Sequence, residues 1–449
     1  MSGLQAFPRI MLTAPSSGGG KTFLTCALIA ALKKRGLNVR AFKCGPDFID
    51  PLFHKKVLGE ESINLDSYFL PDSRLEDFFK TQSNESSIAV IEGVMGYFDG
   101  LGGVSLKASS ADISRITKTP VILCVDCHGQ SRSAAAVVKG FCELDSEKNI
   151  AAVILNQVPS SLEKKLPPLI EELSGIPVLG CIPKLKEGGW QSRHLGLLLP
   201  DEIDDFKNRI DRASDVFLKN INMELLLSIA NRAEKLPKAE NNFLYKNIFL
   251  KNKKNIAVAY DEAFCFYYKA NLDAFKSLGC SLQFFSPLKD SRLPNADCYI
   301  FGGGYPELFA QELSENESMA QDIFCAVKNG SKVLAECGGF LYLQQFLSTK
   351  EGQKFKMVGA IKGESFYAHK LIRFGYAEYT NCEGKKFHSI KGHEFHYFES
   401  TNNGSAFFAQ KASTGEKWKS IISFKNTLAG FPHLYYDSCP EFIADFLEQ

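Results

Sequence analysis

The chain lacks a marked excess of either charge. Its 449 residues include 52 Lys and Arg against 51 Asp and Glu, which gives a net charge of +1. General nucleic-acid binders and membrane-surface binders usually carry a basic excess, so both classes are disfavoured. No apolar run approaches the about 20 residues of a membrane-spanning helix, and the N-terminal residues lack the basic-then-apolar order of a secretory signal. We therefore expect a cytoplasmic protein without a membrane or nucleic-acid partner.

Paired cysteines are also scarce. The 13 cysteines are scattered along the chain, and one pair, Cys124 and Cys127, has C-x-x-C spacing. A zinc ribbon needs a second such pair, so a structural zinc site is not expected. Cysteines at this density, mostly within apolar stretches, are typical of reduced thiols in a cytoplasmic protein.

Short apolar stretches separated by helix-length segments dominate the first half of the chain. The predicted strands are residues 9–13, 38–42, 88–91, 121–125 and 151–155. Unbroken apolar strands with helical connections are typical of a parallel sheet that is covered on both faces. We therefore predict a doubly wound α/β domain with its chemistry at the carboxyl ends of the strands.

A second α/β pattern begins after a polar stretch. A chain of this length predicts two or three domains. Residues 236–255 mix Lys, Asn and Pro, and we predict that they link a domain at 1–235 to another at 256–449. The predicted strands of the second domain are residues 256–260, 298–301 and 332–335.

A glycine-rich loop lies between the first predicted strand and a helix. The loop contains Gly18, Gly19, Gly20, Lys21 and Thr22. In this context glycines let backbone N–H groups surround phosphate oxygens at the helix N-terminus. Lys21 is expected to reach the β and γ phosphates of ATP, and the Thr22 hydroxyl to hold Mg²⁺. Pro15 replaces the first glycine of the usual pattern.

Acidic residues at strand ends are candidates for the same magnesium site. A bound Mg²⁺ needs one or two carboxylates beside the phosphates. Glu92 directly follows a predicted buried strand and is the first candidate, with Asp47 second. Asp126 is equally well explained as a helix cap. The neighbouring Cys127 and His128 fit packing better than metal binding.

Cys337 lies at a predicted strand-to-helix turn in the second half. Glycines follow it directly and allow a sharp turn, which is the pattern of a nucleophile elbow. A helix N-terminus behind the sulfur favours the thiolate. Upstream, Gly303 and Gly304 follow another predicted strand, and their N–H groups are candidates for an oxyanion hole. A buried structural thiol is the alternative reading of Cys337.

A thiol nucleophile needs a base. His433 lies far downstream, where a Cys–His pair separated in sequence can meet in the fold. His393 and His396 form a second candidate group. Their H-x-x-H spacing could indicate a metal site, but no third ligand is evident.

Eight ordered motifs resemble those of the cobyrinic acid a,c-diamide synthase family, glutamine-dependent amidotransferases of the cobalamin pathway. The resemblance covers nearly the whole chain, and Pro15 belongs to this family's own loop pattern. The motifs lie at residues 14–22, 42–51, 64–66, 92–100, 193–196, 302–307, 336–339 and 392–396.

The resemblance implies a division of labour. A C-terminal class I glutamine amidotransferase domain would release ammonia from glutamine through Cys337. The N-terminal phosphate-loop domain is similar to the dethiobiotin synthetase group. It would phosphorylate a carboxylate of a tetrapyrrole polycarboxylate, cobyrinic acid, and ammonia would then displace the phosphate. Lys43 would join Lys21 as a cation at the ATP phosphates, with Mg²⁺ on Thr22 and Glu92. The sequence leaves a homodimer open.

The third member of the glutaminase triad is unassigned. Glutaminases of this class often carry an acid two residues after the catalytic His, where this chain has Tyr435. Asp437 and Glu441 are carboxylates nearby in the sequence.

Three alternatives share part of this pattern. Ni-sirohydrochlorin a,c-diamide synthase of the coenzyme F430 pathway has the same motifs with another macrocycle. Cobyric acid synthase has the same two-domain plan, but the stretches 45–47 and 92–96 favour the diamide enzyme. A regulatory ATPase of the MinD type would carry an extra Lys where this chain has Ser16, and would lack a glutaminase half.

Overall fold

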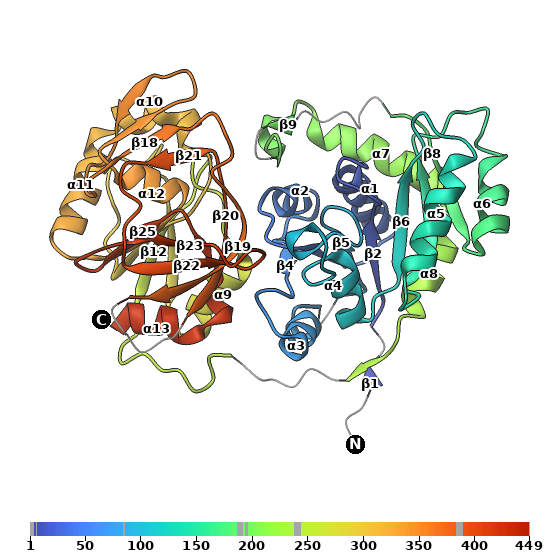
Figure 1. The fold of residues 1–449 in the computed structure, drawn as a ribbon, viewed down its shortest axis with the longest axis horizontal. Helices are drawn as coiled ribbons and strands as arrows, with labels where there is room; N and C mark the ends of the chain where they lie inside the picture. The colour runs from blue at the N-terminus through green and yellow to red at the C-terminus, as the bar shows by residue number, and fades with distance from the viewer. Residues whose placement is uncertain are drawn as a thin grey trace. The chain divides into compact units, whose positions relative to one another are not determined.

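The chain folds into two compact units, each built on its own parallel sheet (Figure 1). The units are Met1–Asn242 and Phe243–Gln449. The computed structural model describes residues 4–5, 7–83, 86–185, 192–193, 196–237, 244–382 and 389–448. Across these ranges, no helix has both the length and the apolar character needed to cross a bilayer. The motif at 193–196 lies partly outside them.

A seven-stranded parallel sheet forms the centre of the N-terminal unit. Its spatial order is β4-β3-β5-β2-β6-β7-β8, with β2 in the middle. The strands are β2 (Arg9–Thr13), β3 (Val39–Cys44), β4 (Ile63–Leu65), β5 (Ile88–Glu92), β6 (Val121–Asp126), β7 (Ile150–Asn156) and β8 (Val178–Ile182). The five predicted strands are confirmed to within two residues, whereas β4 and β8 were not predicted.

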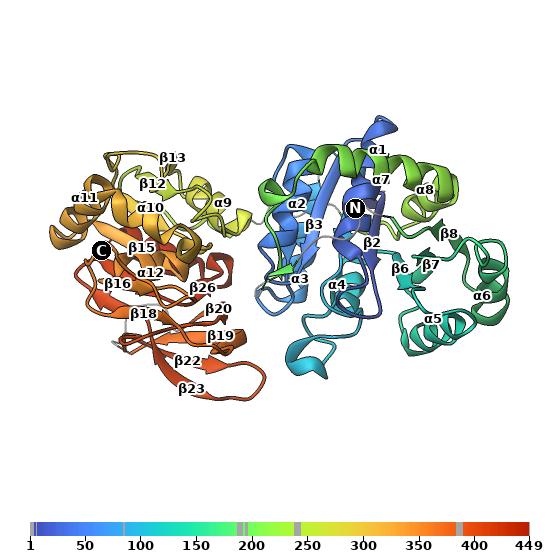
Figure 2. The same cartoon turned by 90° about the horizontal axis from the view of Figure 1, so that it is seen from above.

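Helices cover both faces of this sheet (Figure 2), which confirms the predicted doubly wound fold. Helix α1 contacts α2 and α7 on one face, while α3 contacts α4 and α5 contacts α6 on the other. The helices are α1 (Lys21–Lys34), α2 (Ile49–Leu58), α3 (Asp72–Ser83), α4 (Ser110–Thr117), α5 (Ser133–Leu144), α6 (Leu166–Ser174), α7 (Phe206–Asn220) and α8 (Met223–Asn231). Two short strands, β9 (Ser192–Arg193) and β10 (Gly196–Leu197), pair with each other.

The C-terminal unit combines a mainly parallel sheet with two further sheets. The main sheet has the order β13-β12-β14-β15-β25-β24, and β24 alone runs antiparallel. Its strands are β12 (Asn255–Ala259), β13 (Ser281–Phe285), β14 (Cys298–Phe301), β15 (Lys332–Glu336), β24 (Ile422–Phe424) and β25 (Thr427–Gly430). The helices are α9 (Lys269–Ser277), α10 (Ala310–Glu315), α11 (Glu317–Lys328), α12 (Gly338–Leu343) and α13 (Pro440–Glu448).

The two further sheets were not predicted. An antiparallel sheet has the order β23-β22-β19-β20-β26, and a four-stranded sheet has the order β17-β16-β18-β21. The first contains β19 (Arg373–Asn381), β20 (Ile390–His396), β22 (Phe407–Lys411), β23 (Lys417–Ser420) and β26 (His433–Leu434). The second contains β16 (Phe346–Ser348), β17 (Lys354–Lys356), β18 (Glu364–Tyr367) and β21 (Phe398–Ser400).

The stretch predicted as a linker, 236–255, packs at both of its described ends. Strand β11 (Leu236–Pro237) pairs antiparallel with β1 (Leu4–Gln5). Tyr245 is buried, and its hydroxyl donates to Asp437 Oδ1 at 2.8 Å. The boundary between the compact units therefore falls inside this stretch, and the C-terminal unit begins before its first long strand.

A fully buried arginine anchors the amino end of β2. The Arg9 guanidinium donates to the carbonyl oxygens of Thr117 (2.9 Å), Phe7 (2.8 Å), Lys118 (3.0 Å) and Glu234 (2.6 Å). Burial lowers the pKa of Arg9 to about 10, which leaves it charged at neutral pH. One side chain thus joins β2 to the end of α4 and to the segment after α8.

We predict that Arg9→Met lowers the free energy of unfolding of the N-terminal unit by about 2–4 kcal/mol, because buried carbonyls lose their donor. Hydrogen exchange of β2 and β6 across a urea series measures it. Lys34→Met is the control. It removes exposed ion pairs to Asp211 and Asp215, which should be worth less than about 1 kcal/mol. Equal losses in the two variants would contradict an anchoring role for Arg9.

Candidate functional site

The predicted phosphate loop joins the end of β2 to α1 with a backbone that glycine favours. Gly18 (φ 77°) and Gly20 (φ 82°) have left-handed conformations, and Gly20 is the N-cap of α1. No side chain caps this helix, so its first N–H groups are placed to bind an anion. At the end of β7, Asn156 Nδ2 lies 3.5 Å from the Gly19 carbonyl oxygen, a contact that the sequence did not indicate.

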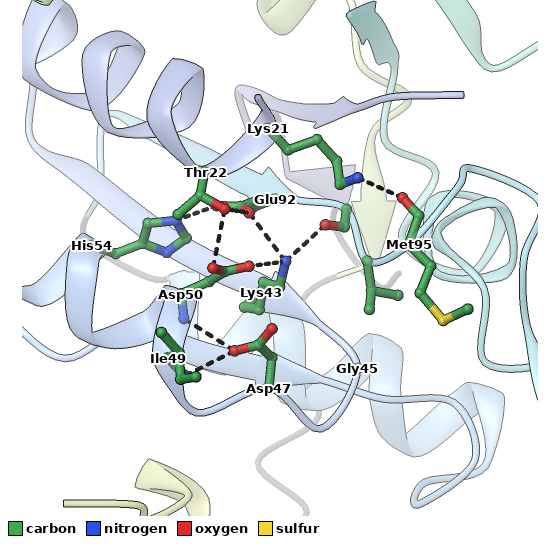
Figure 3. Close-up of polar contacts among 12 residues, drawn as sticks. Lys21, Thr22, Lys43, Gly45, Asp47, Ile49, Asp50, His54, Glu92 and Met95 are labelled. Carbon is green, nitrogen blue, oxygen red and sulfur yellow. Dashed lines mark hydrogen bonds and ion pairs between the residues drawn. The ribbon is translucent and has the colours of Figure 1, made fainter. Parts of the chain in front are cut away.

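Lys21 is held against two carbonyl oxygens beside this loop. Its Nζ donates to Met95 O at 2.6 Å (Figure 3) and to Ser16 O at 2.9 Å. Burial, followed by the positive charge of Lys43, lowers the pKa of Lys21 to about 8. An anion bound at the loop would offset both effects.

A cluster of buried charges surrounds Thr22 at the carboxyl ends of the central strands. The Thr22 hydroxyl lies 3.0 Å from Asp50 Oδ1 and 2.9 Å from Glu92 Oε1 (Figure 3). Lys43 Nζ lies 2.5 Å from Asp50 Oδ2 and 3.1 Å from Glu92 Oε1, and donates to Gly93 O at 2.9 Å. Glu92 and Lys43 are almost wholly buried, so each charge depends on the other.

These contacts shift the pKa values of the cluster in different directions. Burial works against the ionised form of Glu92, but the charge of Lys43 and the hydrogen bond from His54 outweigh it and hold its pKa below the usual range. Burial likewise works against charged Lys43, but Asp50 and Glu92 raise its pKa. For Asp50, burial and repulsion by Asp47 and Glu92 raise the pKa. Glu92 is therefore the firmly ionised carboxylate of the cluster.

Asp50, rather than Asp47, contacts Thr22. Asp47 Oδ1 accepts the backbone N–H groups of Ile49 (2.8 Å) and Asp50 (3.0 Å), so this carboxylate caps the start of α2. The sequence placed Asp50 within a motif but gave no reason to single it out. A metal-binding role for Asp47 stays a prediction.

The oxygen atoms around Thr22 suit magnesium. The described residues include no group of three or more His, Cys, Asp or Glu side chains arranged to hold a metal by themselves. One hydroxyl and two carboxylates nevertheless converge here beside a phosphate loop. Mg²⁺ prefers such hard ligands and completes its shell with phosphate oxygens and water. The residues therefore fit a magnesium–nucleotide site.

The residues at the carboxyl end of β6 have structural contacts. Asp126 Oδ1 accepts the backbone N–H of His128 at 2.9 Å and the Gln157 side chain at 3.1 Å. Cys124 and Cys127 are buried, and burial raises the pKa of Cys127 to about 12. The burial of both thiols agrees with the packing interpretation of the C-x-x-C pair, whereas Asp126 caps no helix, because α5 begins only at Ser133.

Cys337 lies at a sharp turn between β15 and α12. Its backbone has φ 45° and ψ −102°, a strained conformation for a residue with a side chain. The Cys337 N–H donates to Gly430 O at 2.8 Å, which ties the turn to β25. A methyl group on Gly339 would lie 2.3 Å from Phe301 O, so only glycine fits there. The turn has the geometry of the predicted nucleophile elbow.

The predicted oxyanion loop and His433 meet beside this elbow. A Cβ atom on Gly303 would lie 2.3 Å from His433 Cε1. A Cβ atom on Gly338, the residue after Cys337, would lie 3.1 Å from Gly304 N. Because His433 is in β26 and the elbow follows β15, two different sheets bring these residues together.

The thiol and the imidazole are both neutral in this arrangement. Burial and the negative charges of Glu307 and Glu394 raise the pKa of Cys337. This direction is opposite to the thiolate-favouring effect expected from the N-terminus of α12, a helix of only six residues. Burial, followed by His393, lowers the pKa of His433. A neutral imidazole is the form that accepts a proton.

Two further histidines, His393 and His396, lie in the same region as His433. The His393 ring stacks on His433 with 5.6 Å between centroids, and burial lowers the pKa of His393 to about 4. His396 Nε2 donates to Glu394 Oε2 at 2.9 Å, and the His396 ring lies flat on Phe431 at 3.9 Å. Both histidines thus take part in packing and hydrogen bonds within the glutaminase half.

The third member of the triad stays unassigned. Asp437 accepts the Tyr245 hydroxyl, and Glu441 Oε2 lies 3.9 Å from Cys439 Sγ. The sequence did not single out Glu336, whose Oε1 accepts Leu434 N–H at 3.3 Å, next to His433. Burial raises the pKa of Glu336 to about 8. The sequence feature that could have indicated Glu336 is its position directly before Cys337.

Family models match both units. Residues 10–195 match the CobQ/CobB/MinD/ParA nucleotide binding domain, and residues 255–440 match the CobB/CobQ-like glutamine amidotransferase domain. These matches agree with the predicted pairing of a phosphate-loop domain and a glutaminase domain.

Similar proteins span nearly the whole chain. A cobyrinate a,c-diamide synthase of Listeria innocua is 40% identical over 443 residues, covering 96% of this chain and 97% of that protein. Proteins of the same name from Picrophilus torridus (38% identity, 96% of each chain) and Caldanaerobacter subterraneus (37% identity, 98% and 97%) are similarly close. Chloroplast FtsY from Physcomitrella patens aligns with a TM-score of 0.31 at 14% identity, covering 47% of this chain and 67% of that chain, and adds no argument. The chain belongs to the cobyrinate a,c-diamide synthase family of glutamine-dependent ligases.

Proposed function

We propose that the chain converts cobyrinic acid to its a,c-diamide in cobalamin biosynthesis, with ATP and glutamine as co-substrates. The observation that carries this proposal is that one chain contains two sites with the required geometry. One is a phosphate loop with carboxylates at Thr22, and the other is a cysteine elbow with a histidine beside it. Relatives with the same full-length plan bear the name of this activity.

The C-terminal site would release ammonia from glutamine. Cys337 Sγ attacks the side-chain amide carbon, and His433 takes the thiol proton and passes it to the departing nitrogen. The N–H groups of Gly303 and Gly304 stabilise the oxyanion. Water then hydrolyses the thioester to glutamate. Because Cys337 and His433 are neutral before attack, proton transfer accompanies formation of the C–S bond.

The N-terminal site would make a carboxylate electrophilic. A carboxylate oxygen of the acceptor attacks the γ-phosphorus of ATP, and ADP departs. Ammonia then attacks the acyl carbon of the acyl phosphate, and inorganic phosphate departs. Phosphoryl transfer mainly requires positioning and charge neutralisation, which Lys21, Lys43 and the N–H groups of Gly18, Gly19 and Gly20 supply. The same steps at the a and c side chains give the diamide.

Thr22, Asp50 and Glu92 would hold the magnesium ion of Mg-ATP. When bound, the ion neutralises charge on the β and γ phosphates. Asp47 fixes the start of α2 and hence the position of Asp50. Lys43, paired with both carboxylates, would supply positive charge beside the bound nucleotide.

We predict that two substitutions separate the sites. Cys337→Ala should reduce glutamine-driven amidation by about 100-fold or more and leave ammonia-driven amidation intact, because only the nucleophile is lost. Lys21→Ala should reduce amidation from both donors by about 100-fold or more, because phosphoryl transfer loses a cation. Rates with glutamine and with ammonium salts measure both effects. Equal losses from both donors in Cys337→Ala, or ammonia-driven activity retained in Lys21→Ala, would overturn the assignment.

We also predict that Gly303→Ala acts on the glutaminase alone. The added methyl group would overlap the His433 ring, so glutamine hydrolysis should fall by about 100-fold. Ammonia-driven amidation should not change. Gly140→Ala in α5 is the control, since a methyl group there meets no atom within 4 Å. Full glutaminase activity in Gly303→Ala would show that the loop does not position the base.

The acceptor is tested by supplying Mg-ATP and glutamine with either cobyrinic acid or Ni-sirohydrochlorin. We expect two amides on cobyrinic acid and none on the nickel tetrapyrrole, counted by mass spectrometry. Two amides on the nickel compound alone would assign the protein to the coenzyme F430 pathway, with the same chemistry. Glutaminase activity without product from either would show that the acceptor is another polycarboxylate.

A further inference from the structure

The two oxygen atoms of Glu92 have separate partners. Oε1 faces Thr22 and Lys43, at 2.9 and 3.1 Å. Oε2 lies 2.7 Å from His54 Nε2 (Figure 3), and both Glu92 and His54 are wholly buried. The carboxylate therefore cannot rotate without losing a contact on each side.

His54 is itself fixed at both ring nitrogens. A carboxylate oxygen only accepts, so Nε2 donates to Glu92. On the other side, Nδ1 lies 3.0 Å from Ser62 Oγ, and Ser62 is buried as well. A neutral ring with its proton on Nε2 satisfies both contacts, with the Ser62 hydroxyl as donor to Nδ1.

A single helix brings His54 and Asp50 to the cluster. They are four residues apart in α2 and therefore lie on the same face. Asp50 contacts Thr22 and Lys43, while His54 contacts Oε2 of Glu92, the carboxylate oxygen that does not contact Thr22. The position of α2 thus sets both carboxylates at once.

We propose that His54 is a positioning residue of the synthetase half, which holds Glu92 so that Oε1 faces Thr22 and the cation of Mg-ATP. This inference rests on the proposed function, since it needs a magnesium–nucleotide site at Thr22. Removal of His54 leaves Oε2 without its donor in a buried site, and the carboxylate is free to turn toward Lys43. Hydrogen-bond partners of metal-binding side chains typically contribute about 10–100-fold in metal affinity.

The test compares His54→Ala and His54→Gln in the full-length chain. Mn²⁺ is titrated in the presence of a non-hydrolysable ATP analogue, and the free ion is read by electron paramagnetic resonance. We expect the Mn²⁺ dissociation constant to rise about 10-fold or more in His54→Ala. In His54→Gln the amide N–H can replace Nε2–H, so the constant should stay within about 3-fold of the unmodified chain.

Thr117→Val is the matched control. It removes buried hydrogen bonds to Ile113 O and Thr119 Oγ1 (2.7 Å each) at the end of α4, near Arg9 at the amino ends of the strands. It should lower stability without moving the Mn²⁺ constant. A similar rise in Thr117→Val, or an equal rise in His54→Ala and His54→Gln, would assign His54 a general structural role and overturn the inference.

Glu92→Gln distinguishes this inference from the proposed function. If Glu92→Gln weakens Mn²⁺ binding and His54→Ala does not, the positioning role is wrong and the cation site stands. If Glu92→Gln leaves Mn²⁺ binding unchanged, the cation site itself is misplaced and the inference falls with it. If His54→Ala does not fold, His54→Leu takes its place. A Mn²⁺ dissociation constant that is raised in His54→Leu and unchanged in His54→Gln supports the positioning role. Equal dissociation constants in these two variants overturn it.

Discussion

The buried ion pair between Lys43 and Glu92 is the interaction on which the N-terminal site depends. Strand register creates it, because Lys43 of β3 lies directly beside Glu92 of β5. Neither side chain reaches solvent, so the charge of each must be compensated by a partner within the protein. Thr22, Asp50 and His54 supply the remaining contacts, and each comes from an element that packs on these strands. The parallel sheet therefore positions the carboxylates, the phosphate loop and the lysines at one edge.

The elbow at Cys337 in the C-terminal unit depends on backbone strain. Cys337 is held at φ 45° by bonds to its neighbours on β25 and by the close packing of Gly339 on Phe301. Burial raises the pKa of Cys337 and lowers that of His433, so both groups are neutral. A neutral thiol reacts slowly with electrophiles, so this state limits side reactions of Cys337.

Local signals in the sequence predicted a large part of both sites. The phosphate loop and the cysteine elbow each follow from a strand, a glycine-rich turn and a helix that are adjacent in the chain. Asp50 was not singled out, because the direction of its side chain depends on where α2 begins, and a shift of one residue turns a side chain by about 100° around a helix axis. His54 lacked a signal because its role depends on β5, which is distant in sequence. The antiparallel sheet that carries His433 and His393 was not predicted, and its strand β26, which holds His433, has only two residues.

Transfer of oxygen-18 is the most direct test of carboxylate activation by the N-terminal site. Cobyrinic acid labelled with oxygen-18 in its side-chain carboxylates would be incubated with Mg-ATP and ammonia, and the phosphate released would be analysed by mass spectrometry. An acyl phosphate predicts one labelled oxygen atom in inorganic phosphate for each amide formed. Amide formation with unlabelled phosphate would contradict carboxylate phosphorylation and the role given to the cluster around Lys43 and Glu92.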